Sequence, residues 1–265
     1  MGDLYVLKTS LVDALKPKRL AIATCMILLP ALAALIWRAI SPASRYDSTE
    51  VYNTLAAYFI FGFSLNILAV IYGTGALAAE IEGRTIVYLL TRPIPRWRLL
   101  LMKMIGAWLG ITMTVLVSTL LLGLAAYAGK PDWARMGADL RVLPLGALAY
   151  SCLFLFFATL LPRPLIWALL YGFGWENIAA FFPGGFARLS ILSYLRTLSP
   201  HLKEVLGAGG DGDGADLSSL ILQSTPARIT QPIAWGAISG IIVVTLVLAL
   251  VCFNTREYVP REEGA

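Results

Sequence analysis

Three polar residues inside long apolar runs are the first candidates for a chemical role. Glu176 and Asn177 follow two glycines in the run GFGWEN, and Asn66 lies within another apolar run. An unpaired charge at membrane depth costs at least about 2.5 kcal/mol, so an ionisable residue there is a functional candidate. Glu176, Asn177 and Asn66 are therefore predicted to line or gate a substrate path. The alternatives are structural: Glu176 pairs with Arg188 or caps a short helix, and Asn66 bridges two helices.

The stretch of residues 80–103 combines charged residues, helical spacing and helix-breaking prolines. Glu80 and Arg84 stand four residues apart in the favourable order, and the apolar residues at 86, 89 and 90 fall on another side of the helix. Pro93 ends this helix because the residue before a proline avoids the helical conformation. The pattern predicts an amphipathic helix at the membrane surface that docks another protein. An ordinary basic loop between two membrane spans is the alternative.

Signatures of other chemistries are missing from the sequence. It contains no GxxxxGK[ST] phosphate loop, HExxH or CxxC, and its three cysteines lie far apart in apolar runs. His201 is the only histidine and has no serine or cysteine nucleophile at a recognisable spacing. We therefore expect no metal, no cofactor and no ATP hydrolysis in this chain. The basic residues are not interleaved with exposed aromatic residues, which argues against nucleic acid as a partner.

The composition places these residues in a membrane protein. The chain of 265 residues is 58% hydrophobic and 14% charged, whereas about 25% of the residues in soluble domains are charged. A helix that crosses a bilayer needs about 20 mostly apolar residues. The sequence therefore predicts an all-α polytopic membrane protein with a single domain, residues 1–265, and six transmembrane helices at 20–40, 53–78, 99–128, 142–161, 165–182 and 233–253.

The positions of the basic residues predict how this protein lies in the membrane. Lys and Arg concentrate before residue 20, in 79–98, at Arg163 and after residue 254, which marks these segments as cytoplasmic. Residues 1–19 carry leucines at helical spacing and then a basic collar, typical of an interface helix that lies on the membrane. In the longest outer segment, 183–232, the leucines between 186 and 206 predict short extracytoplasmic helices. An even number of spans places both termini in the cytoplasm.

These features resemble the ABC-2 type transporter permeases. The resemblance rests on Glu82-Gly83-Arg84-Thr85, on Leu89-Leu90-Thr91-Arg92-Pro93 and on the basic-led helix that reaches Lys103, and the six-span layout is similar over nearly the whole chain. In that family the segment after the second span, here 79–98, forms a coupling helix that binds the nucleotide-binding subunit. The residues that the resemblance assigns to this contact are Glu80, Glu82, Arg84, Thr85, Thr91, Arg92 and Pro93.

The resemblance implies the permease subunit of an ATP-driven transporter in the cytoplasmic membrane of a prokaryote, with export as the family's usual direction. ATP and Mg²⁺ are then expected on separate ABC ATPase subunits. The other expected partners are membrane lipids and a second permease, identical or homologous, with the translocation path between the two permeases. Two other functions remain open: an integral membrane enzyme that acts on lipid headgroups through Glu176 and His201, and an ATP-independent channel or secondary transporter.

Overall fold

The computed structural model describes residues 16–42, 46–77, 95–176, 189–199 and 230–255, which form helices and short connections without a β-strand. In chain order the helices are α2 (Pro17–Ile40), α3 (Ser48–Leu55), η1 (Ala56–Ser64), α4 (Leu65–Ala69), η2 (Val70–Thr74), α7 (Arg96–Ala126), α8 (Trp133–Leu160), α9 (Pro164–Leu169), η3 (Leu170–Trp175), α11 (Ile191–Leu198) and α14 (Gln231–Thr255). The η segments are π-helices, which continue the neighbouring α-helices with a wider turn.

Five helices in the described part of the chain are long and apolar enough to cross a membrane: Arg19–Ile40, Ser48–Leu77, Arg96–Ala126, Trp133–Leu160 and Gln231–Thr255. This result confirms the all-α polytopic fold. The predicted span 165–182 corresponds to a shorter apolar helix, Pro164–Trp175, and its residues from 177 onward lie outside the described ranges. Helix α11 falls within the segment 183–232, for which the sequence predicts short helices.

A polar cap extends helix α8 beyond the apolar run of the sequence. The Asp132 carboxylate accepts hydrogen bonds from the backbone N–H groups of Ala134 and Arg135, at 3.1 and 3.4 Å. These bonds satisfy N–H groups that the first turn of a helix leaves without an internal partner. The helix therefore begins at Trp133, well before residue 142, where the apolar run begins.

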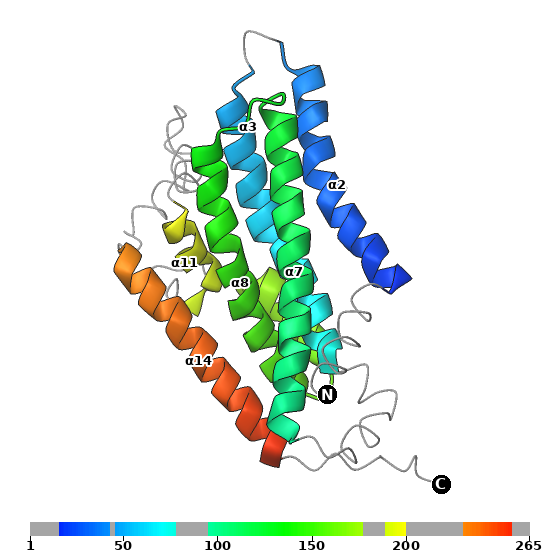
Figure 1. Cartoon of the computed structure of the whole chain (residues 1–265), viewed down its shortest axis with the longest axis vertical. Coiled ribbons are helices and arrows are strands. Elements are labelled where there is room, and N and C mark those ends of the chain that lie inside the picture. Colours follow the sequence, from blue (N-terminus) through cyan, green and yellow to red (C-terminus); the bar gives the residue numbers. More distant parts are fainter. Residues whose placement is uncertain (1–15, 43–45, 78–94, 177–188, 200–229, 256–265) are drawn as a thin grey trace.

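Helices α7 and α8 form the centre of the bundle, with α2 packed along α7 and α14 packed along α8 (Figure 1). In the most apolar window of α8, 67% of the residues are buried, compared with 22% in the windows of α2 and α14. A helix that is apolar on all sides but little buried needs apolar surroundings. Helices α2 and α14 therefore present wide apolar faces to lipid or to other membrane proteins.

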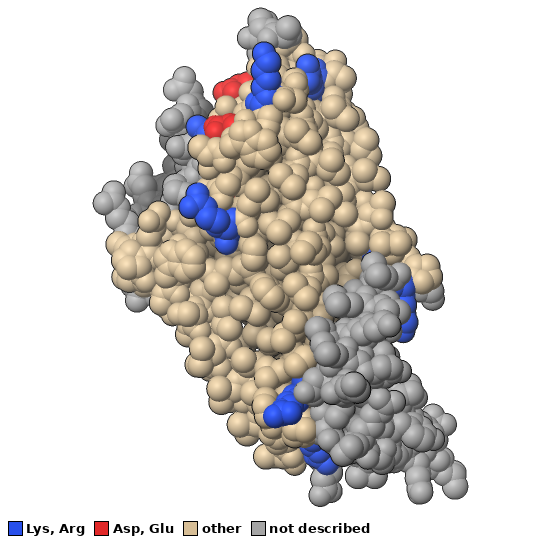
Figure 2. Space-filling view, viewed as in Figure 1, with Lys and Arg blue, Asp and Glu red and all other residues tan. Residues whose placement is uncertain are grey.

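Charged side chains gather toward the two ends of this bundle. On the face that Figure 2 shows, most of the surface between the ends is uncharged, although a few Lys and Arg side chains lie part of the way along it, and the acidic side chains in view lie near one end only. The first turns of α2 and α7, with Arg19 in one and Arg96 and Arg98 in the other, carry basic residues. A largely uncharged surface between polar ends matches the hydrocarbon core of a bilayer.

One contact fastens the first span to the end of the second. The Arg19 guanidinium donates a hydrogen bond to the Gly75 carbonyl oxygen at 3.1 Å and lies over the Tyr72 ring, 5.7 Å from its centroid. Gly75 directly follows η2, in the last described turn of the second span. The start of α2 and the end of the second span are therefore joined close to residue 77, where this described range stops.

Candidate functional site

Glu176 is buried where the helix Pro164–Trp175 ends and α11 begins. The residue is 1% exposed. Its carboxylate accepts hydrogen bonds from the Tyr150 hydroxyl at 3.0 Å, from the Ser190 hydroxyl, and from the backbone N–H groups of Ile191 at 3.1 Å and Leu192 at 3.2 Å. These donors replace the water that a carboxylate loses on burial, so the charge can be accommodated inside the bundle.

The two backbone donors are the first residues of α11, so Glu176 caps that helix from a different segment of the chain. Ser190, the residue directly before α11, adds a local cap: its hydroxyl accepts a hydrogen bond from the N–H of Ser193 at 3.2 Å. A helix N-terminus carries a partial positive charge and stabilises an anion beside it. The contact corresponds to one alternative from the sequence, in which Glu176 caps a short helix. Arg188, its possible pairing partner, lies outside the described residues.

Arg196 in α11 adds a positive charge to these surroundings. Burial lowers the pKa of its guanidinium, and the nearby Tyr150 and Glu176 oppose this shift. Its Nε atom has no hydrogen-bond partner among the described residues. The site thus places a buried carboxyl group near a largely buried guanidinium, and an attraction between opposite charges there is screened little by water.

Asp139 is a second buried carboxylate, which the sequence pattern does not single out. It lies in α8, is 0% exposed, and accepts hydrogen bonds from the Tyr52 hydroxyl at 2.7 Å and the Ser199 hydroxyl at 2.9 Å. In the sequence it belongs to the polar stretch that precedes the fourth apolar run. The available signal is its helical spacing with Leu143 and Tyr150, which are also buried. That spacing is readable only if the helix is known to start before residue 142.

The two carboxylates fasten α11 at both of its ends. Glu176 binds the first turn of α11, and Asp139 binds Ser199, which directly follows the helix. Both connections lead to α8, through Tyr150 at one end and through Asp139 itself at the other. Tyr52 adds α3, at the start of the second span. Helix α11 is therefore linked by buried polar contacts to the second, fourth and fifth apolar helices.

Asn66 joins the second and fifth apolar helices by a further buried contact. It is 0% exposed, and its amide nitrogen donates a hydrogen bond to the Gly172 carbonyl oxygen at 2.8 Å. Its Oδ1 atom has no hydrogen-bond partner among the described residues. Asn66 lies in α4 between the π-helices η1 and η2, and Gly172 lies in η3. π-Helices are rare and are frequent at functional sites, so this crossing deserves a functional test.

The other predicted site residues lie outside the described ranges. They are Asn177, His201 and the proposed ATPase contacts Glu80, Glu82, Arg84, Thr85, Thr91, Arg92 and Pro93. Of the predicted site residues, the structure therefore describes Glu176 and Asn66. It adds Asp139 as a further buried polar residue of the candidate site. In the ranges that the structure describes, no group of three or more His, Cys, Asp or Glu side chains is placed to hold a metal ion.

Long apolar helices with buried hydrogen bonds between them define a polytopic integral membrane protein. The chain belongs to the ABC-2 transporter family, because the family model described as "ABC-2 family transporter protein" matches residues 6–258. A comparison with curated proteins gives no significant match. Membership makes this chain a transmembrane permease subunit of an ABC transporter, a type of subunit that is not itself catalytic and that associates with ABC ATPases. It confirms the resemblance seen in the sequence.

Proposed function

We propose that this chain is one of two permeases in an ATP-driven exporter and that the translocation path lies between the two permeases. The family match over residues 6–258 carries this proposal. The little-buried apolar faces of α2 and α14 also support it, since they leave room for a second permease beside the bundle. In this proposal the protein lies in the cytoplasmic membrane of a prokaryote with both termini in the cytoplasm.

Separate ATPase subunits supply the energy in this proposal and bind the ATP and Mg²⁺. The sequence contains no phosphate loop, which is consistent with the binding of ATP by separate subunits. ATP binding draws the two ATPases together and displaces the coupling segment, residues 79–98. The residues in contact with the ATPase are Glu80, Glu82, Arg84, Thr85, Thr91, Arg92 and Pro93. The contact between Arg19 and Gly75 then passes the displacement to the first span.

Glu176, Asn177 and Asn66 form part of a gate in this proposal. The support is that Glu176 and Asn66 each make buried hydrogen bonds between different helices. When the spans rearrange, α11 moves with α8, because Asp139 of α8 binds Ser199 at the C-terminal end of α11. The gate opens only when hydrogen bonds to Glu176 break, so these bonds control access to the translocation path.

The test is to co-express the chain with an ABC ATPase from the same organism and to purify the complex through a tag on the permease. The double variant Glu82→Ala, Arg84→Ala is expected to reduce both ATPase co-purification and ATP hydrolysis, because it removes charges from the docking helix. Lys130→Ala is the matched control: it removes an exposed charge from the turn between α7 and α8 and is expected to change neither. Wild-type co-purification by the double variant contradicts the assignment of the coupling segment, and an absence of any ATPase from the wild-type preparation contradicts the proposal as a whole.

A further inference from the structure

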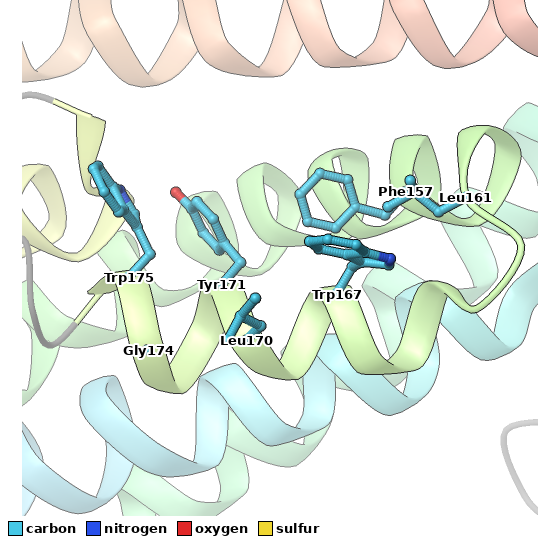
Figure 3. A pocket seen from close by; sticks show the side chains of 7 residues that line it. All are labelled: Phe157, Leu161, Trp167, Leu170, Tyr171, Gly174 and Trp175. Atoms are coloured by element: carbon cyan, nitrogen blue, oxygen red, sulfur yellow. The ribbon is translucent and has the colours of Figure 1, made fainter.

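A groove on the side of the bundle lies between α8 and the helix formed by α9 and η3 (Figure 3). Its volume is about 410 Å³, within the range of about 300–1,000 Å³ that small ligands occupy in proteins. Phe157 of α8 and Leu161, which directly follows α8, line it from one side, and Trp167, Leu170 and Trp175 line it from the other. The groove is therefore large enough for a ligand and is built mainly from aromatic rings.

The lining of this groove is entirely apolar. Tyr171 contributes its ring, which packs edge-on against Phe157 with the centroids 6.1 Å apart, while its hydroxyl donates a hydrogen bond to the Leu189 carbonyl oxygen at 3.3 Å. Gly174 adds space, because a Cβ atom there would meet only the Leu170 Cδ1 atom, at 3.7 Å. Water needs several polar partners in order to stay in a cavity, and this groove offers none.

The groove faces the surroundings of the bundle. Trp167 is 48% exposed and Leu170 is 60% exposed, and both belong to a helix whose other exposed residues include Leu165 and Ile166. In the proposed membrane arrangement the medium around this helix is hydrocarbon. An empty apolar groove forfeits dispersion contacts, and a flexible hydrocarbon chain restores them. The nine residues from Trp167 to Trp175 extend about 12 Å along the helix, which suits a chain laid lengthwise.

A positive charge stands where the groove ends. Leu161, a lining residue, and Pro164, the first residue of α9, flank a turn that contains the exposed Arg163. Basic residues at the membrane surface attract the phosphates of lipid headgroups. We propose that the groove binds one acyl chain of a membrane phospholipid whose phosphate contacts Arg163. This lipid site depends on the membrane location of the chain and is independent of ATPase coupling.

Photo-crosslinking of the full-length chain in vesicles tests the site. The probe is a phosphatidylglycerol with a diazirine in the middle of one acyl chain, and mass spectrometry of peptides locates the adducts. Adducts per residue in 157–175 are expected to exceed, by several-fold, those on the exposed face of α14 at 243–251, which meets exchanging lipid. Gly174→Leu fills the groove and is expected to lower its labelling to the level of α14. Gly240→Leu, at a position of α14 with nothing within 4 Å of an added Cβ atom, is the control and leaves the labelling unchanged.

Two further variants keep the outcome decisive. Leu170→Trp fills the groove from its exposed side and replaces Gly174→Leu if that variant folds poorly. Arg163→Gln is expected to reduce labelling by the phosphatidylglycerol probe but not by a diacylglycerol with the same diazirine chain, which lacks the phosphate. Equal labelling of the groove and of α14, or unchanged labelling in a folded groove-filling variant, overturns the acyl-chain site. Unchanged phosphatidylglycerol labelling in Arg163→Gln overturns the phosphate contact.

Discussion

Glu176 and Asp139 are each acceptors of more than one buried hydrogen bond. In a region without water, a donor that loses its acceptor costs more free energy than the bond itself contributes to stability. The effect of a substitution at these residues is therefore governed by the donors that it leaves unpaired. The loss of the negative charge itself contributes less to the change in stability.

Replacement of Glu176 by Gln places an NH₂ group opposite backbone donors. The N–H groups of Ile191 and Leu192 bind different oxygens of the carboxylate, so either orientation of the amide leaves one of them without an acceptor. We expect Glu176→Gln to destabilise the fold by about 1–3 kcal/mol, the usual cost of an unsatisfied buried group. Thermal unfolding in detergent measures the loss. Glu50→Gln, at an exposed position in the first turn of α3, is the control, and equal unfolding temperatures for the two variants contradict the prediction.

Gly172 is expected to tolerate no side chain while Asn66 is present. A Cβ atom at position 172 would lie 2.8 Å from the Asn66 Oδ1 atom and 3.1 Å from its Cγ atom. Gly172→Ala should therefore destabilise the protein by about 1–3 kcal/mol, typical of an overpacked core. Gly137→Ala in α8, where an added Cβ atom meets nothing within 4 Å, should not do so. The double variant Asn66→Ala, Gly172→Ala relieves the clash, so a double variant less stable than Gly172→Ala contradicts this explanation.

At the scale of elements, α11 has too few residues to be stable alone, since isolated helices shorter than about 12 residues are marginal in water. It has eight residues and is amphipathic, with Ile191, Leu192 and Leu195 buried against the bundle. The carboxylates at its two ends add polar contacts to this packing. Its stability is therefore expected to depend on both anchors.

Hydrogen exchange followed by mass spectrometry measures that dependence. Asp139→Asn, which weakens the bonds from Tyr52 and Ser199, is expected to speed exchange in α11 while α2 keeps its wild-type rate. Tyr46→Phe is the matched control, because it removes a hydroxyl that binds the Ala126 carbonyl oxygen, away from α11. If α11 exchanges equally fast in Asp139→Asn and in Tyr46→Phe, the anchor at this end contributes nothing.

At the scale of the whole molecule, the number of spans decides on which side the C-terminus lies. The described residues contain five long apolar helices and the shorter Pro164–Trp175. Six crossings place both termini on one side of the membrane, whereas five place them on opposite sides. The basic residues in the first turns of α2 and α7 mark the cytoplasmic end in our proposal.

Reporter fusions resolve this question. Green fluorescent protein fused after residue 265 is expected to fluoresce, and alkaline phosphatase fused at that site is expected to be inactive, because both reporters then stay in the cytoplasm. Alkaline phosphatase fused after residue 210, in the predicted outer segment, is expected to be active. The opposite pattern at the C-terminus shows that Pro164–Trp175 does not belong to a complete crossing.

The amino-acid sequence alone determined the membrane location, the apolar helices and the candidacy of Glu176 and Asn66. Each of these follows from local composition, because the free energy of transfer into lipid depends on the residues of a single segment. The family follows as well, from motifs read along the chain and a match over residues 6–258. The ATPase contacts in 79–98 and the gate stay predictions.

Only the tertiary structure decided which groups surround the buried charges. Glu176 takes its hydroxyl donors from residues 26 and 14 positions away, and Asp139 takes one from Tyr52, 87 positions away. Such pairs depend on the way in which helices pack against one another. Hydrophobic periodicity shows which face of a helix is buried, but not which helix covers that face. The capping of α11 and the position of Asp139 in the core therefore became visible only in the folded bundle.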